Sequence, residues 1–212
     1  MNKKNKLDIN EYYAKEILER TFFNRDIIFV LDSPDLRFYD DNSYGIEVVT
    51  IGNFDIHKWL KSKNNFILGK HKPIVDYKNE TYFEFVEKAK IPTFSKLKKT
   101  FEEEIKKKYL KRNTYKLEKI DLYIEIYVDR LNKMDKKFIE DTIISIEKDK
   151  RKKYQEYYIK TITEIYSLRN KKVIKISKDL DIVSYYYATT LALQDKFKKT
   201  PWRCFLFTIY FL

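Results

Sequence analysis

The sequence predicts an α/β fold, of the α+β kind, built around one mixed central sheet. Three short β-branched or aromatic runs follow one another between residues 27 and 51, with only turn residues between them. A helical apolar stripe begins after Pro92. Residues 120–128 then alternate between apolar and polar side chains, which is the clearest strand pattern in the chain.

The first element is a helix over residues 9–21. Asp8 is a suitable N-cap, and apolar residues recur at helical spacing from Ile9 to Ile17. Glu16 is the exception, because it lies in the middle of that apolar face. A carboxylate on the face that should meet the sheet is therefore a candidate functional group.

Three strands are expected next, over residues 27–31, 36–39 and 44–51. Turn residues separate them at 32–35 and again at 40–43. Because both connections are short, we expect antiparallel neighbours.

The remainder of the chain is predicted from the same periodicities. Residues 52–92 form an insert, punctuated by two prolines, that we leave without assigned elements. The elements beyond it are a helix over 94–110, a strand over 120–128, a long helix over 135–168, a strand over 172–177, a helix over 180–197 and an apolar tail after Pro201 that forms a strand or docks on the domain. We divide the chain into a core of residues 1–128 and a C-terminal extension of residues 129–212, packed on the same domain.

The chain is strongly basic, with 44 Lys and Arg against 32 Asp and Glu and a net charge of +12. This excess favours an anionic partner, most simply nucleic acid. An AT-rich coding sequence also yields many Lys, Asn, Ile and Tyr residues and few Gly, so coding bias is an equal alternative explanation of the charge.

Cysteine and apolar content indicate the compartment. The single Cys204 cannot form an internal disulfide, which favours a reducing environment, and with only two His it gives no zinc ligand cluster. No apolar stretch approaches the roughly 20 residues that span a bilayer. We expect a cytoplasmic protein without a membrane partner.

Residues 8–128 resemble the αβββαβ core of the PD-(D/E)xK nuclease superfamily. In that family the first acid enters with the second strand, and the second acid lies on the third. Here Pro34-Asp35 opens the second expected strand, and Glu47 interrupts the apolar third one. The resemblance implies a restriction-endonuclease-like fold and hydrolysis of phosphodiester bonds in DNA, with Mg²⁺ or Mn²⁺ as cofactor.

The resemblance also implies the roles of individual residues. Divalent ions activate water and neutralise phosphate charge, and Mg²⁺ prefers carboxylate oxygens. Asp35 and Glu47 would be the catalytic metal ligands, joined by the backbone carbonyl of Val48 and the carboxylate of Glu16. Each acid also has a structural alternative: Asp35 as a turn residue, Glu47 as a paired buried charge, and Glu16 as an ion-pair partner at the helix edge.

One position departs from the family pattern. The family's lysine, two residues after the second acid, is Val49 here. Lys98 falls inside the apolar stripe of the helix over 94–110, so we expect it to supply the missing catalytic cation; the alternative is that its stem simply snorkels. On the fourth strand, Asp121 and Glu125 share the polar face, and we expect them to be solvated or ion-paired.

Three functions are compatible with these observations: a nuclease of a phage, mobile element or defence system, a degenerate member of the same fold that binds nucleic acid or protein without cleaving, and a protein-interaction module that uses the helix over 135–168 and the apolar tail. For the first two we expect a basic face on the side of the site, drawn from Lys96, Lys98, Lys99 and the Lys-rich helices. A homodimer is a further candidate assembly. Metal binding separates the nuclease from the others, and salt-dependent DNA affinity separates the first two from the third.

Overall fold

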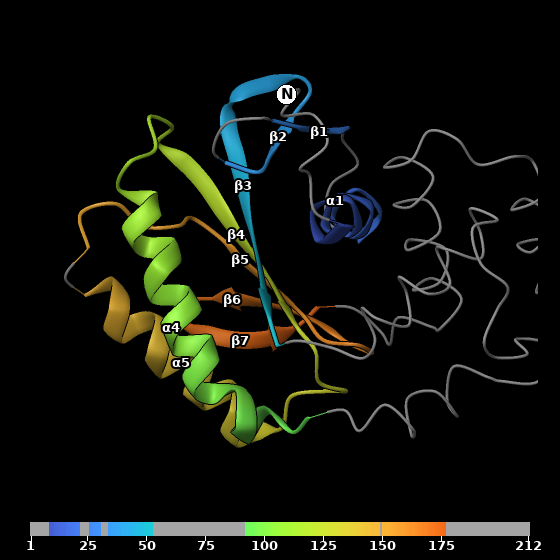
Figure 1. Ribbon diagram of the computed structural model, residues 1–212, viewed down its shortest axis with the longest axis vertical. Coiled ribbons are helices and arrows are strands. Elements are labelled where there is room, and N and C mark those ends of the chain that lie inside the picture. Colours follow the sequence, from blue (N-terminus) through green and yellow to red (C-terminus); the bar gives the residue numbers. More distant parts are fainter. Residues whose placement is uncertain (1–8, 22–25, 31–33, 53–91, 149, 177–212) are drawn as a thin grey trace, which may run out of the picture.

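In a computed structural model of the chain, the structure describes residues 9–21, 26–30, 34–52, 92–148 and 150–176. These residues form three helices and one open, mixed sheet of seven strands (Figure 1). The elements in chain order are α1 (Ile9–Thr21), β1 (Ile27–Phe29), β2 (Leu36–Phe38), β3 (Asp41–Ile51), α4 (Phe94–Arg112), β4 (Lys119–Ile126), α5 (Lys133–Glu147), β5 (Tyr157–Lys160), β6 (Ile165–Arg169) and β7 (Lys172–Lys175).

The strands lie in the sheet in the order in which they occur in the chain. The outer pairs β1–β2, β2–β3, β5–β6 and β6–β7 are antiparallel, whereas β3, β4 and β5 run parallel. Glu47 of β3 is in register with Leu122 of β4. The predicted mixed sheet, with the strand over 120–128 beside the strand over 44–51, is therefore confirmed.

Helices cover both faces of the sheet (Figure 1). α4 and α5 lie on one face, where the apolar stripe of α4 meets Val49 and Ile51 of β3 and alternate residues of β4 in the main core. α1 lies on the other face and buries Ile17 and Leu18 there. The central strands are covered on both sides, as is usual for parallel strands. The predicted helices over 9–21 and 94–110 are confirmed.

The predicted long helix over 135–168 is wrong. α5 begins after Asn132, whose side chain accepts a hydrogen bond from the backbone N–H of Asp135 in a capping box, and it ends at Glu147. The Tyr- and Ile-rich residues that follow form β5 and β6 instead. All four residues of β5 are buried because the strand lies beside β4, and this tertiary neighbour outweighs the helical spacing.

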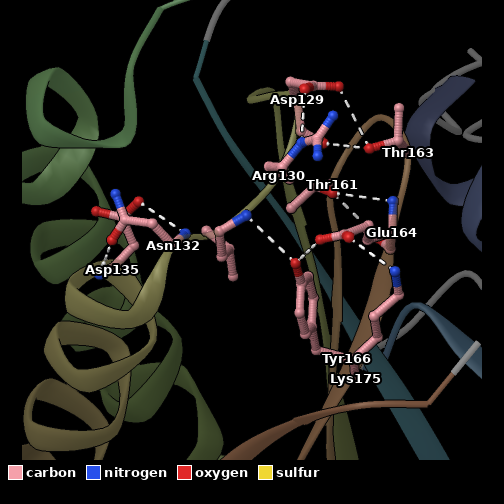
Figure 2. A network of polar contacts seen from close by, with 10 residues as sticks. Asp129, Arg130, Asn132, Asp135, Thr161, Thr163, Glu164, Tyr166 and Lys175 are labelled. Atoms are coloured by element: carbon pink, nitrogen blue, oxygen red, sulfur yellow. Dashed lines mark hydrogen bonds and ion pairs between the residues drawn. The ribbon is translucent and has the colours of Figure 1, made fainter. Parts of the chain in front are cut away.

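The extension after residue 128 therefore continues the same sheet as far as Lys175. Asn170 and Lys171, with φ values of 49° and 63°, form the tight turn between β6 and β7. A polar network ties the β4–α5 connection to the β5–β6 turn (Figure 2). In it, the Thr163 hydroxyl donates to the carbonyl of Asp129 at 2.8 Å, and the Tyr166 hydroxyl donates to the carboxylate of Glu164.

Some predictions fall on segments outside the described residues. They are the helix over 180–197, the apolar tail after Pro201, Cys204 and nearly all of the insert over 52–92. Among the helices that are described, none combines the length and the apolar character needed to cross a membrane.

Candidate functional site

Glu47 is a fully buried carboxylate in the middle of β3, on the face that α4 covers. Three side chains from α4 and the turn after it donate to this carboxylate. Lys108 Nζ and Lys111 Nζ lie 2.6 Å and 2.8 Å from Oε1, and the Tyr115 hydroxyl lies 2.6 Å from Oε2. A buried charge of this kind is tolerated because it is both paired and hydrogen-bonded.

Asp35 reaches the same place from the start of β2. Its Oδ2 accepts a hydrogen bond from the backbone N–H of Val48 at 2.8 Å and lies 3.8 Å from Lys108 Nζ. One ammonium thus lies within 4 Å of both carboxylates. Lys111 adds a second, weaker link, with its Nζ 4.0 Å from Asp35 Oδ1.

A glycine allows this close approach. A Cβ atom built on Gly45 would lie 2.1 Å from Cγ of Pro34, far inside van der Waals contact. Pro34 therefore packs directly on the backbone of β3, and this contact carries the adjacent Asp35 to the amide of Val48. Any side chain at position 45 would separate the two strands at the site.

The end of α4 is fixed over β3 by further polar contacts. Arg112 is 2% exposed, and its guanidinium donates to the carbonyls of Leu117 at 2.9 Å and Lys153 at 3.2 Å. The Tyr154 hydroxyl donates to the carbonyl of Lys108 at 2.9 Å. These bonds hold the last helical turn and the α4–β4 connection in place, so the ammonium groups are preorganised.

The surroundings shift the pKa values of Glu47 and Asp35 in opposite directions. Burial by itself raises the pKa of Glu47, but the charge of Lys108 and the hydrogen bonds from Lys108, Lys111 and Tyr115 outweigh burial and hold the pKa below its usual value. Burial and the negative charge of Glu47 raise the pKa of Asp35, against the opposing effect of both lysines. Such a pair, with pKa values moved apart, is typical of functional sites.

Lys111 responds to the same charges. Burial lowers the pKa of its ammonium. The hydrogen bond to Glu47 and the charges of Glu47 and Asp35 raise this pKa by more than burial lowers it, so that it lies above its usual value. Lys111 therefore remains a cation at neutral pH. It is the more exposed of the two lysines, with a side-chain exposure of 42% against 18% for Lys108.

The structure brings Asp35 and Glu47 together at Lys108, but Lys98 lies elsewhere. Its Nζ stands 4.9 Å from the ring centroid of Phe138 in α5. Lys98 precedes Lys108 by ten residues, a distance of about 15 Å along the helix axis.

Glu16 is 8% exposed on α1, across the sheet from α4, with the Nζ of Lys15 at 3.7 Å from its carboxylate. Within the described ranges, no three His, Cys, Asp or Glu residues gather closely enough to hold an ion together. Glu16 therefore does not join Asp35 and Glu47 in a three-residue site. Val48 contributes its N–H to Asp35.

Sequence reasoning missed Lys108, Lys111 and Tyr115. A signal was available, because Lys108 follows Ile105 by three residues and so lies on the flank of the buried stripe. The run Lys106-Lys107-Lys108 hid it: the first and second lysines are exposed and paired with glutamates of the same helix, and only the third turns inward.

The polar face of β4 is buried and not solvated. Asp121 and Glu125 are 0% and 1% exposed beneath the α1 side of the sheet. Glu125 is in register with the buried Lys160 of β5, whose pKa burial lowers to about 8 against the opposing charge of Glu125. Asp121 accepts hydrogen bonds from the Tyr44 hydroxyl and the Glu156 N–H, and burial raises its pKa to about 7. The solvated alternative is wrong for both acids.

The donor set at Asp35 and Glu47 suits one kind of ion. Two carboxylates and retained waters match the coordination that Mg²⁺ and Mn²⁺ accept, whereas a cage of protein ligands is absent from the described part of the chain. Lys108 and Lys111 would have to withdraw from Glu47 to admit the ion. The long, partly exposed side chain of Lys111 has room to do so.

No protein-family model, curated protein or solved structure matches the chain.

Proposed function

We propose that the chain is a metal-dependent nuclease-like protein with a restriction-endonuclease-like core, hydrolysing phosphodiester bonds in DNA. The observation that carries the proposal is the convergence of Asp35 and Glu47 with two lysines of α4 on one face of the sheet. The element order from α1 to β4 supports the same fold. In it, β1 pairs with β2 and β2 with β3 in antiparallel fashion, and β3 pairs with β4 in parallel.

The lysine missing from β3 has an equivalent on α4. Val49 packs in the apolar core on the same face as Glu47, and the nearest ammonium groups come from Lys108 and Lys111. An ammonium at this point would orient the attacking water and offset the charge that develops on the scissile phosphate. The cation has moved from the strand to the covering helix.

Asp35 and Glu47 would hold the Mg²⁺ or Mn²⁺ ion, with the carbonyl of Val48 as a further oxygen donor. When bound, the ion supplies water activation and charge neutralisation at the phosphate. The chain's own groups position the ligands: the Val48 N–H orients Asp35, and the Tyr115 hydroxyl holds the second oxygen of Glu47. Lys108 is the nearest group to act as the orienting cation.

Plasmid nicking in Mg²⁺ or Mn²⁺ tests the proposal. Glu47→Gln and Asp35→Asn should each reduce the rate by about 100-fold or more, because each removes a charged ligand. Glu118→Gln, which neutralises an exposed acid in the α4–β4 turn, is the matched control and should retain the rate. If the wild-type chain nicks neither DNA nor RNA with either ion, hydrolysis is rejected.

A second candidate is a non-cleaving member of the same fold that binds nucleic acid. The observation that favours it is that both oxygens of Glu47 already have donors, so that the carboxylate needs no ion. Calorimetry with Mn²⁺ separates the two candidates. Binding by wild type that is lost in Glu47→Ala supports the nuclease, and equal binding or no binding by both proteins supports the inert form. The interaction module loses the helix over 135–168, because α5 ends at Glu147, while the apolar tail that it also uses lies outside the described residues.

A further inference from the structure

The connection between α5 and β5 is the most basic segment of the described chain. Residues 148–153 read Lys-Asp-Lys-Arg-Lys-Lys, five cations and one acid. Arg151 and Lys153 are exposed, and Lys150 is half-buried. We call residues 150–154 the basic loop.

The basic loop is docked beside the carboxylate pair. Lys152 Nζ donates to the carbonyl of Tyr115 at 2.6 Å, and the Tyr154 hydroxyl donates to the carbonyl of Lys108. Tyr115 and Lys108 are two of the three residues whose side chains bind Glu47. The loop is therefore hydrogen-bonded to residues that themselves bind Glu47, and these bonds fix its position relative to the carboxylate pair.

Several exposed lysines of the helices are paired with acids, whereas cations of the basic loop are not paired with described residues. On α4, Lys99, Lys106 and Lys107 each pair with a glutamate one turn away, and on α5 Lys137 pairs with Asp141 at 2.7 Å. The side chains of Lys150, Arg151 and Lys153 form no ion pair with any other described residue. The basic loop therefore presents three cations, none of them paired with a described acid, next to the site.

Stabilisation of a helix end does not account for these cations. Lysines near a C-terminus interact favourably with the helix dipole, but the effect is confined to the last turn. The last turn of α5 contains no basic residue, and Arg151 and Lys153 lie beyond it. A stability role would also not require, on one short loop, three cations that pair with no described acid.

We propose that the basic loop binds the phosphate backbone of nucleic acid and directs the strand toward Asp35 and Glu47. The inference rests on the proposed function and names the surface that meets its substrate. A membrane surface is the weaker partner, because the aromatic side chain of the loop, Tyr154, is buried and does not extend toward lipid. The loop also replaces the expected face at Lys96, Lys98 and Lys99, which lies at the opposite end of α4.

Fluorescence anisotropy with a labelled 24-base-pair duplex, in EDTA, measures binding without cleavage. The test variant is Lys150→Ala/Arg151→Ala/Lys153→Ala in the full chain. Its charge-matched control is Lys96→Ala/Lys99→Ala/Lys137→Ala, three exposed lysines at the far end of the helical layer. The test variant should bind on the order of tenfold more weakly and reduce the slope of log K against log salt by about 2–3, since each phosphate contact contributes about 0.9.

The outcomes separate this inference from the proposed function. Equal losses in both variants, or no binding by wild type to DNA or RNA of the same sequence, would overturn the role of the loop. Tighter binding of the full chain to anionic phosphatidylserine vesicles than to DNA or RNA would also overturn the role of the loop. DNA binding that depends on the loop, without any Mg²⁺-dependent nicking, would support the role of the loop and reject the nuclease. Nicking at an unchanged rate in the loop variant would support the nuclease and reject the role of the loop.

Discussion

The two ends of α4 use lysine in different ways. Near its start, Lys98 stacks on the ring of Phe138, beside Phe94 and Phe101 in an apolar corner between α4 and α5. Near its end, Lys108 reaches the buried carboxylate of Glu47. Both lysines flank the same buried stripe. The difference shows that a helical pattern gives the side of the helix on which a residue lies, while the strand beneath it decides what that residue meets.

The largest expected contrast between the two ends is in activity. Lys108→Ala should reduce nicking by about 100-fold or more, because it removes the cation closest to Glu47. Lys98→Ala should leave the rate within about threefold of wild type, since it removes only a ring contact. Nicking rates of the two purified variants provide the measurement. Loss in Lys98→Ala with retention in Lys108→Ala would instead restore the role that the sequence predicts for Lys98.

The free energy of unfolding should also fall more on substitution of the lysines at the end of α4 than on substitution of Lys98, but by a smaller factor than activity does. Lys108→Met/Lys111→Met leaves the carboxylate of Glu47 buried with Tyr115 as its remaining donor, and should cost about 3 kcal/mol of unfolding free energy. Lys98→Met keeps an apolar stem against Phe138 and should cost less than about 1 kcal/mol. Urea unfolding followed by circular dichroism measures both. Similar losses in the two proteins would mean that Glu47 does not depend on its lysines.

The last contrast is in the pH dependence of stability, and Asp121 gives the comparison. Glu47 and Asp121 are both fully buried. The ammonium groups at the end of α4 lower the pKa of Glu47. Asp121 has hydrogen bonds from a hydroxyl and a backbone N–H, and burial raises its pKa to about 7. Glu47 therefore stabilises the fold above its unfolded pKa of 4.5, and this contribution is lost as the pH falls through the lower folded value. Asp121 contributes stability below its unfolded pKa of 3.8, and this is lost as the pH rises toward 7.

Substitution should separate the two effects. Glu47→Gln should flatten the decline in unfolding free energy on the acid side, and Asp121→Asn should flatten the decline between about pH 4 and pH 7. Urea unfolding at a series of pH values, with the wild-type chain as reference, measures both slopes. An unchanged profile in Asp121→Asn would mean that this carboxyl stays ionised when buried.

The sequence by itself determined the elements whose patterns are local. The helices over 9–21 and 94–110, the three strands before residue 52 and the strand over 120–128 all follow from periodicity and turn residues, because each buries its own stripe or alternating face. Glu47 was identifiable for the same reason: a charge in an apolar strand requires partners.

Only the tertiary structure decided the rest. The helical spacing after residue 147 gave way to β5 and β6, because β4 offers an edge to which those Tyr and Ile residues can pair. The partners of Glu47 were decided by the axial position of α4 over β3, which brings its last turn, and not its first, to the carboxylate. Periodicity fixes the angle of a side chain around a helix, but only packing fixes how far along a neighbouring strand that side chain lies.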